Sequence, residues 1–206
     1  MLGGTFDPPH LGHAVIAGEA LWRLKLDEVL LIPARLPPHK PAGTHGDPVQ
    51  RLRWTRALAG GRPGLRVRSD EIDRPGPSYT VDTLTALASE YPDASLWFIM
   101  GADQLGALPT WHRWRRIITL ARIAAIPRAE VPLAEIRRIA DRVAPGRVDT
   151  LEIPRVDISS TLVRERIAAG LPVWHLVPER VHAALADDGL VPSATVRTEG
   201  SDLADQ

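Results

Sequence analysis

The sequence predicts an α/β protein built on a doubly wound parallel sheet of about five strands, with helices on both faces. Short apolar runs alternate along the chain with segments whose apolar residues recur every three or four positions. The short runs are continuous rather than alternating, which is typical of strands covered on both faces. Strands that alternate with helices indicate βαβ units, so the expected architecture is Rossmann-like.

Five short apolar runs are predicted to be the strands. They comprise residues 29–32, 65–67, 96–100, 122–126 and 150–153. Four of these runs are followed directly by a residue that interrupts strand pairing or favours a turn, namely Pro33, Gly101, Pro127 and Pro154.

The segments between these runs show helical periodicity and helix-start signals. Ile16, Ala20 and Leu24 are spaced four residues apart and share one helical face. Asp47 precedes Pro48, as an N-cap residue precedes a proline at the first helical position. Further helices are predicted after Ser78, over residues 132–143 and 161–169, and from Pro178 to just before Gly189.

The length of 206 residues suits one globular domain. We expect a single domain over residues 1–190 and a polar tail over residues 191–206. Residues 36–48 form a long loop rich in proline, glycine and histidine, and loops of this length are often functional. A flexible insertion without function is the alternative for that loop.

Charge and composition exclude several classes of protein. The 25 basic and 25 acidic residues cancel, which argues against a nucleic-acid partner, although a small anionic ligand needs only a few cations. The chain has no cysteine, which excludes disulfides, thiolate catalysis and cysteine-held metal sites. No apolar run approaches the roughly 20 residues of a membrane span and no signal peptide is visible, so we expect no membrane partner and a cytoplasmic location.

The first candidate site lies at residues 3–13, which read GGTFDPPHLGH. The pair Gly3 and Gly4 permits a tight turn and a close backbone approach to a ligand. A helix is predicted to begin near His10, and its N-terminus favours an anion. His10 and His13 are three residues apart and face the same side of that helix. The segment predicts a polyphosphate site, although it has neither a P-loop nor a G-x-G-x-x-G pattern.

Zinc is a second interpretation of the histidines in this part of the chain. His10, His13, His39 and His45 offer four imidazoles. Their spacing follows no regular zinc pattern, so the phosphate interpretation is preferred.

The second candidate site follows the last predicted strand. Ser159, Ser160 and Thr161 stand at a predicted helix start, where hydroxyls either cap the helix or hold phosphate oxygens. Arg164 lies one turn further along and can reach the same anion with two parallel hydrogen bonds. Both interpretations, a capped helix and an anion site, remain open for this segment alone.

Together the two segments resemble the nucleotidylyltransferase superfamily, whose H-x-G-H and I-S-S-T-x-x-R motifs flank ATP. Within it the chain is similar to the bacterial nicotinate-nucleotide adenylyltransferases over about residues 3–190. Four short intermediate motifs support the resemblance because they occur in the family's order: PPHK at 37–40, SYT at 78–80, GAD at 101–103 and TW at 110–111.

The resemblance implies adenylyl transfer from ATP, with Mg²⁺ carried on its phosphates, to nicotinate mononucleotide. The products are deamido-NAD and pyrophosphate, in NAD biosynthesis. It implies catalytic roles for His13, His10 and Arg164. It assigns the ATP phosphates to Gly3, Gly4, Thr5, Phe6, Lys40, Ser159, Ser160 and Thr161. It assigns the mononucleotide to Thr80, Asp103 and Trp111, with Trp111 stacked on the pyridine ring. No residue is assigned as a metal ligand.

Several alternatives stay open. The acceptor could instead be nicotinamide mononucleotide or phosphopantetheine, and a non-catalytic nucleotide-binding module is the hypothesis from another class. A homo-oligomer is also open. The family's first strand has several apolar residues before the glycine pair, whereas only Met1 and Leu2 precede Gly3 here. We therefore expect either a very short first strand in the middle of the sheet or a start site upstream.

Overall fold

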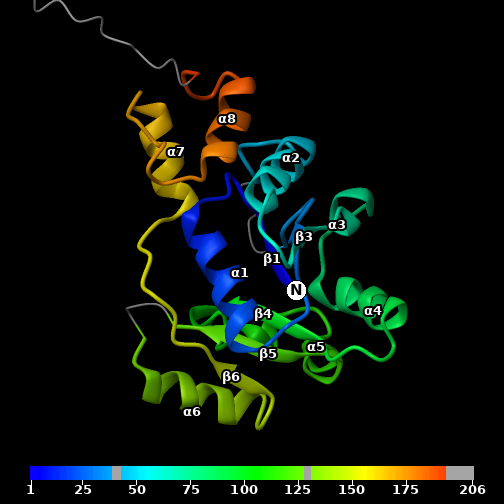
Figure 1. Cartoon of the computed structure of the whole chain (residues 1–206). Helices are drawn as coiled ribbons and strands as arrows, with labels where there is room; N and C mark the ends of the chain where they lie inside the picture. The colour runs from blue at the N-terminus through cyan, green and yellow to red at the C-terminus, as the bar shows by residue number, and fades with distance from the viewer. Residues whose placement is uncertain (39–42, 128–130, 194–206) are drawn as a thin grey trace, which may run out of the picture.

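The computed structural model describes residues 1–38, 43–127 and 131–193. In this part of the chain six strands form one parallel sheet in the order β3-β2-β1-β4-β5-β6, with helices on both faces (Figure 1). The predicted fold class is confirmed, with six strands where about five were expected. The strands are β1 (Leu2–Gly4), β2 (Val29–Pro33), β3 (Leu65–Val67), β4 (Trp97–Gly101), β5 (Arg122–Ile126) and β6 (Val148–Thr150).

Strand β1 is short and lies in the middle of the sheet. Leu2 pairs with Leu31 of β2 on one side and with Ile99 of β4 on the other. The strand ends at Gly4, and Thr5 begins the loop that leads to the first helix. A very short first strand, one of the two alternatives left open by the sequence, is present. Its carboxyl end opens directly onto the segment with the predicted phosphate site.

The prediction of a strand at residues 150–153 is wrong. Strand β6 begins earlier, at Val148, and pairs with β5 at the edge of the sheet. The apolar residues that suggested the later strand, Leu151 and Ile153, pack against the core after the strand has ended. The apolar run therefore marks burial of an extended segment, whereas the paired edge residues are more polar.

Two hydrophobic cores lie on opposite faces of the sheet. On β2, Leu31 belongs to one core, and its neighbours Leu30 and Ile32 belong to the other. The first core packs against α1 (Leu11–Arg23), α2 (Pro48–Ala59), α7 (Ser160–Ala168) and α8 (Glu179–Asp187). The second packs against α4 (Thr80–Glu90), α5 (Trp114–Leu120) and α6 (Leu133–Val143). None of the helices in the described ranges is long and apolar enough to cross a membrane.

Six of these helices were predicted, and their start signals act as expected. The Asp47 carboxylate accepts hydrogen bonds from the backbone N–H groups of Val49 at 2.8 Å and Gln50 at 2.9 Å, which caps α2. Helix α5 was not predicted, because Ile117 is its one fully buried residue and arginines surround it. Three shorter helices complete the described part of the chain: α3 (Asp70–Asp73), η1 (Ala102–Gln104) and η2 (Leu108–Thr110).

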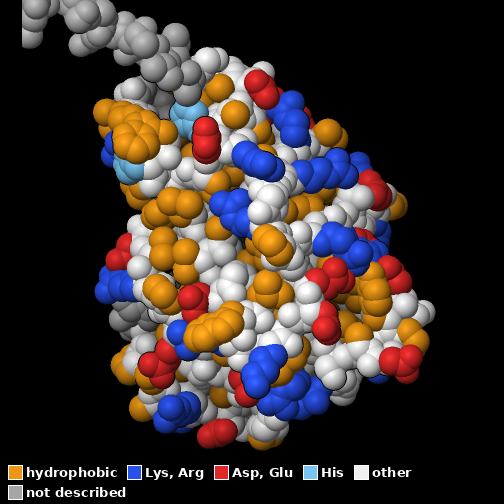
Figure 2. All heavy atoms as spheres, viewed as in Figure 1, with side chains coloured by type: hydrophobic (Ala, Val, Ile, Leu, Met, Phe, Trp, Pro, Cys, Tyr) orange, Lys and Arg blue, Asp and Glu red, His pale blue; other side chains and the backbone are white. Residues whose placement is uncertain are grey.

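Charges of both signs are mixed on the surface. On the face shown in Figure 2, basic and acidic side chains are interspersed. This distribution agrees with the net charge of zero. An anion site in this protein therefore depends on local donors rather than on a field from the whole molecule.

Candidate functional site

A cleft of about 1100 Å³ opens at the carboxyl ends of the central strands. Gly3, Gly4 and Thr5 line it at the end of β1, and Gly101 and Asp103 line it at the end of β4. From β1 the sheet continues to β2 on one side, and from β4 it continues to β5 on the other. In open α/β sheets, ligands bind at this point where the strand order reverses. The cleft is therefore the candidate functional site.

Most of the residues predicted from sequence meet at this cleft. Those that line it are Gly3, Gly4, Thr5, His10, His13, Thr80, Asp103, Trp111, Ser159, Ser160 and Thr161. Phe6 and Arg164 do not line it: Phe6 packs on His13, and Arg164 donates to the backbone carbonyl of Asp7. Lys40 lies outside the described residues. The two segments predicted to bind phosphate and the three residues predicted to bind the mononucleotide therefore share one cleft.

Helix α1 begins at the cleft, with His10 as its extended N-cap residue. A side chain at Gly12 would collide with His10, because a Cβ atom there would lie 3.0 Å from the imidazole ring. Glycine at this position therefore allows the His10 ring to pack against the first turn of the helix. The same ring lies 3.9 Å from that of His13, centroid to centroid.

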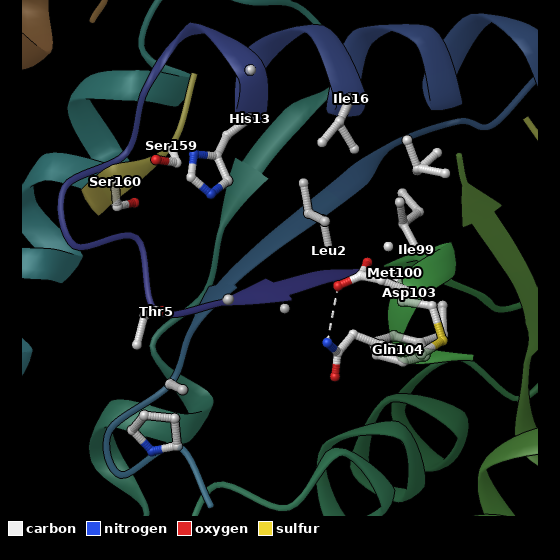
Figure 3. A pocket seen from close by; sticks show the side chains of 18 of the residues that line it. Leu2, Thr5, His13, Ile16, Ile99, Met100, Asp103, Gln104, Ser159 and Ser160 are labelled. Carbon is white, nitrogen blue, oxygen red and sulfur yellow. Dashed lines mark hydrogen bonds between the residues drawn. The ribbon is translucent and has the colours of Figure 1, made fainter. Parts of the chain in front are cut away.

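His13 is oriented by contacts on two sides. Its Nδ1 accepts a hydrogen bond from the His10 backbone N–H at 3.2 Å, and its ring packs on Phe6 at a centroid distance of 4.9 Å. Because Nδ1 is the acceptor, the neutral ring has its proton on Nε2. Figure 3 shows the ring pointing from α1 into the cleft. His13 is thus set to donate from Nε2 to an anion in the cleft.

Phe6 was predicted to contribute its backbone to the phosphate site, and its side chain has a packing role. The side chain is 1% exposed and lies in the core beside His13. Its backbone has φ of +50°, in the left-handed region that non-glycine residues seldom adopt. This conformation turns the chain sharply after β1, so that the loop passes along the cleft before α1 begins.

The second predicted segment is tied directly to the first. The Ser160 hydroxyl donates to the backbone carbonyl of Pro8 at 2.9 Å, and Arg164 Nη1 donates to the carbonyl of Asp7 at 2.6 Å. Ser159 Oγ accepts from the Leu162 N–H at 3.1 Å and caps α7. The capping interpretation is confirmed. The anion-site interpretation stays a prediction, for which the hydroxyls of this segment lie in the wall of the cleft.

The residues assigned to the mononucleotide line the part of the cleft next to β4. Trp111 is half-buried, and its ring meets Phe98 edge-on at a centroid distance of 6.0 Å. Asp103 lies in η1 directly after β4, and its carboxylate accepts from the Gln104 side-chain amide at 3.0 Å. Thr80 is the first residue of α4. An aromatic face, a carboxylate and a hydroxyl are therefore present on this side.

Asp7 is a buried residue of the site that the sequence analysis missed. It is 3% exposed, and its carboxylate accepts from the backbone N–H groups of His45 and Gly46, each at 2.9 Å. These contacts hold the end of the long loop against the loop that leads from β1 to α1. The sequence offered no signal for this pairing, because 38 residues separate Asp7 from His45.

Arg51 is the second missed residue, and it is fully buried. It donates to four backbone carbonyls, those of Thr5 at 2.8 Å, Ala34 at 2.6 Å, Arg35 at 3.2 Å and Gly46 at 3.1 Å. Burial lowers the pKa of the Arg51 guanidinium, while the negative charges of Asp7 and Asp47 act in the opposite direction. Arg51 therefore joins the floor of the cleft to the long loop.

Glu71 is the third missed residue and lies in the wall of the cleft. It is 4% exposed, and burial raises the pKa of its carboxyl group. Tyr79 and His112 also line the cleft, with ring centroids 4.4 Å apart.

The histidines considered for zinc are not grouped as a metal site within the described residues. His45 lies beside Asp7, with Nδ1 at 3.5 Å from the carboxylate. His39 lies outside the described residues. Over residues 1–38, 43–127 and 131–193, no group of three or more His, Asp or Glu side chains is placed to hold a metal ion. The anion-binding interpretation of this segment remains the one that the geometry supports.

Comparison with known proteins gives consistent family matches. The sequence model of the cytidylyltransferase-like family matches residues 1–166. A protein of Dehalococcoides mccartyi named probable nicotinate-nucleotide adenylyltransferase is 42% identical over 194 residues, which cover 92% of this chain and 95% of that protein. A Geobacillus kaustophilus protein with the same name is 36% identical over 206 residues. That alignment covers 100% of this chain and 91% of the Geobacillus protein.

Solved structures show the same fold. Nicotinic acid mononucleotide adenylyltransferase from Plasmodium falciparum, in complex with NaAD, superposes with a TM-score of 0.74 over 92% of this chain and 94% of that chain. The sequences are 14% identical. This likeness independently supports the Rossmann-like architecture described above.

Proposed function

The chain belongs to the nicotinate-nucleotide adenylyltransferases, within the cytidylyltransferase-like family, and on that premise we propose that it transfers the adenylyl group of ATP to nicotinate mononucleotide. The products are deamido-NAD and pyrophosphate, a step of NAD biosynthesis. The main structural support is that both phosphate-site segments and the Trp111 side open onto one cleft at the switch point of the sheet.

We assign the ATP phosphates to the side of the cleft formed by the two linked segments. The Gly3–Gly4–Thr5 backbone, the start of α1 and the Nε2 atom of His13 supply donors there. Arg164 is held by the Asp7 carbonyl and by Thr161, whose hydroxyl it approaches at 3.3 Å. The remaining assigned groups are Phe6, His10, Lys40, Ser159 and Ser160.

The chemistry requires alignment and charge stabilisation rather than a base on the enzyme. The attacking group is the 5′-phosphate of the mononucleotide, which is already ionised at neutral pH. The two substrates must lie in line at the α-phosphate while pyrophosphate leaves. Donors such as His13 Nε2 would stabilise the negative charge that shifts during transfer. Mg²⁺ enters as part of the MgATP substrate, because this ion keeps several waters and binds largely through phosphates.

We assign the mononucleotide to Thr80, Asp103 and Trp111 on the β4 side of the cleft. The exposed face of Trp111 suits stacking on the pyridine ring, and the Asp103 carboxylate suits a ribose hydroxyl. The acid rather than the amide as acceptor is supported by the names of the curated relatives. Nicotinamide mononucleotide, phosphopantetheine and a non-catalytic role remain the alternatives to test.

We further place this activity in one domain over residues 1–190, with a polar tail over residues 191–206. We also propose that the enzyme is cytoplasmic and has no nucleic-acid or membrane partner. Whether it forms a homo-oligomer is a question for measurement. Sedimentation of the purified chain at several concentrations would give the assembly state.

The test of the proposed function is pyrophosphate release with MgATP. Nicotinate mononucleotide, nicotinamide mononucleotide and phosphopantetheine are offered separately to the full chain. Strong turnover with the acid alone supports the proposal. Preference for either other acceptor would replace the assigned acceptor, and nucleotide binding without turnover in a folded protein would favour the non-catalytic alternative.

The Trp111→Ala variant is expected to raise the KM for nicotinate mononucleotide by about tenfold or more, because stacking on an aromatic ring contributes about 1–3 kcal/mol. The KM for ATP should change little, since Trp111 lies on the β4 side of the cleft. Trp22→Ala is the matched control, because that side chain is 71% exposed on α1. An effect confined to ATP would show that the two sides of the cleft are assigned the wrong way round.

A further inference from the structure

The cleft wall contains a buried carboxyl group that the reaction itself does not use. Glu71 lies in the short helix α3 and is 4% exposed. A buried acidic side chain is stable only when hydrogen bonds satisfy it. Its partners therefore show which parts of the protein depend on it.

The first partner of Glu71 is in helix α4. The fully buried Thr83 hydroxyl donates to Glu71 Oε1 at 2.7 Å. Arg74 Nη2 in turn donates to the Thr83 oxygen at 3.0 Å, so this hydroxyl both donates and accepts. Glu71 thereby fixes the first turn of α4, three residues after Thr80.

The second partner is Ser78, which immediately precedes α4. Its hydroxyl oxygen accepts from the backbone N–H groups of Arg35 at 2.9 Å and Leu36 at 3.3 Å. The Ser78 side chain also lies close enough to Glu71 to act on its carboxyl group, whose pKa it lowers. The Ser78 N–H also donates to the Leu36 carbonyl at 2.9 Å. Ser78 therefore joins the start of the long loop to the segment that leads into α4.

Thr80 lies between two residues linked to Glu71: Thr83, which donates to it, and Ser78, whose side chain acts on its carboxyl group. Ser78 precedes it by two residues and Thr83 follows it by three. Pro37 and Pro38, next to the anchored Leu36, line the same cleft. Glu71 therefore lies where two wall segments on the mononucleotide side meet.

We infer that Glu71 is a positioning residue for the acceptor: it sets the Ser78–Thr80 segment and the start of the long loop so that nicotinate mononucleotide binds between them. This inference rests on the proposed function and adds a specificity element to it. Burial raises the pKa of the Glu71 carboxyl group, while the Thr83 hydrogen bond and the charge of Arg74 act in the opposite direction.

The test compares two substitutions at Glu71 in the full chain. Glu71→Ala removes the acceptor, and it is expected to raise the KM for nicotinate mononucleotide by about tenfold while the KM for ATP and kcat stay within about threefold. Glu71→Gln keeps an amide oxygen for Ser78 and Thr83, and it should return the KM to within about threefold of the wild-type value. Thr83→Val removes one donor with little change of shape and should shift the same KM by about threefold.

Asp188→Ala is the control for loss of a hydrogen-bonded, partly buried carboxylate outside the cleft. Asp188 accepts from Trp54 Nε1 at 2.7 Å and joins α2 to α8 away from the cleft. It is expected to lower thermal stability while leaving the ratio of the two KM values unchanged. All variants are assayed well below their unfolding temperatures.

Three results would overturn the inference. These are an equal rise of both KM values in Glu71→Ala and Thr83→Val, a Glu71→Gln variant as impaired as Glu71→Ala, or a shift of the KM ratio in Asp188→Ala. Failure of the proposed function looks different, because the wild-type chain would then release no pyrophosphate with this acceptor. Titration calorimetry of the mononucleotide into each variant gives a second measure of the same affinity change.

Discussion

Replacing His13 with alanine is expected to lower kcat by about 100-fold or more while the protein keeps its fold. His13 Nδ1 already accepts the His10 N–H, so the ring presents Nε2 to the cleft. A donor held in place before the reaction stabilises developing charge without reorganisation, and this is where one lost hydrogen bond has its largest effect. Because the contact is expected to strengthen in the transition state, KM should change much less than kcat.

The His13 prediction has two informative companions. His13→Gln places an amide N–H near the position of Nε2 and should recover part of the lost rate. His175→Ala removes an exposed histidine that does not line the cleft, and its kcat should remain near the wild-type value. Single-turnover pyrophosphate release measures the chemical step directly. Near-normal turnover in a folded His13→Ala protein would remove His13 from the catalytic groups.

The parts of this protein that depend on local sequence were predictable. Continuous apolar runs located most strands, and the Asp47–Pro48 signal located the start of α2. The two segments that meet at the cleft were also recognisable, because their glycines, histidines and hydroxyls lie close together along the chain. Failures occurred where an apolar residue is buried without strand pairing, as at Leu151 and Ile153.

The supporting residues of the site could not be predicted in the same way. Asp7 and Glu71 look like ordinary surface acids, and their partners lie on other elements. Only Lys25 and Lys40 among the 25 basic residues are lysines, which leaves 23 arginines, so an arginine by itself is uninformative. One signal for Arg51 did exist, because it shares a helical face with the buried Thr55 and Leu58.

Arg51→Met is expected to destabilise the protein by about 3–5 kcal/mol, the loss typical of breaking a buried charged network. Methionine fills similar space but leaves four inward-facing carbonyls without their donor. For a chain of this size, such a loss lowers Tm by about 10 °C. Arg51→Lys keeps a charge but has one compact ammonium in place of the planar guanidinium, so an intermediate loss is expected.

The control for Arg51 is Arg56→Met, which removes an exposed arginine from the same helix and should change stability by about 0.5 kcal/mol or less. Thermal and denaturant unfolding of the three variants measure the differences. Equal stability of Arg51→Met and Arg56→Met would show that the four carbonyls find other donors.

The Arg51 network also connects stability with activity. Its four acceptors belong to three different segments: the loop after β1, the end of β2 and the end of the long loop. Thr5 is both an acceptor of Arg51 and a wall residue of the cleft. Loss of Arg51 should therefore lower kcat/KM even at temperatures where the variant is folded. The buried charge is expensive to desolvate, yet it joins three segments around the cleft, two of which Asp7 also links.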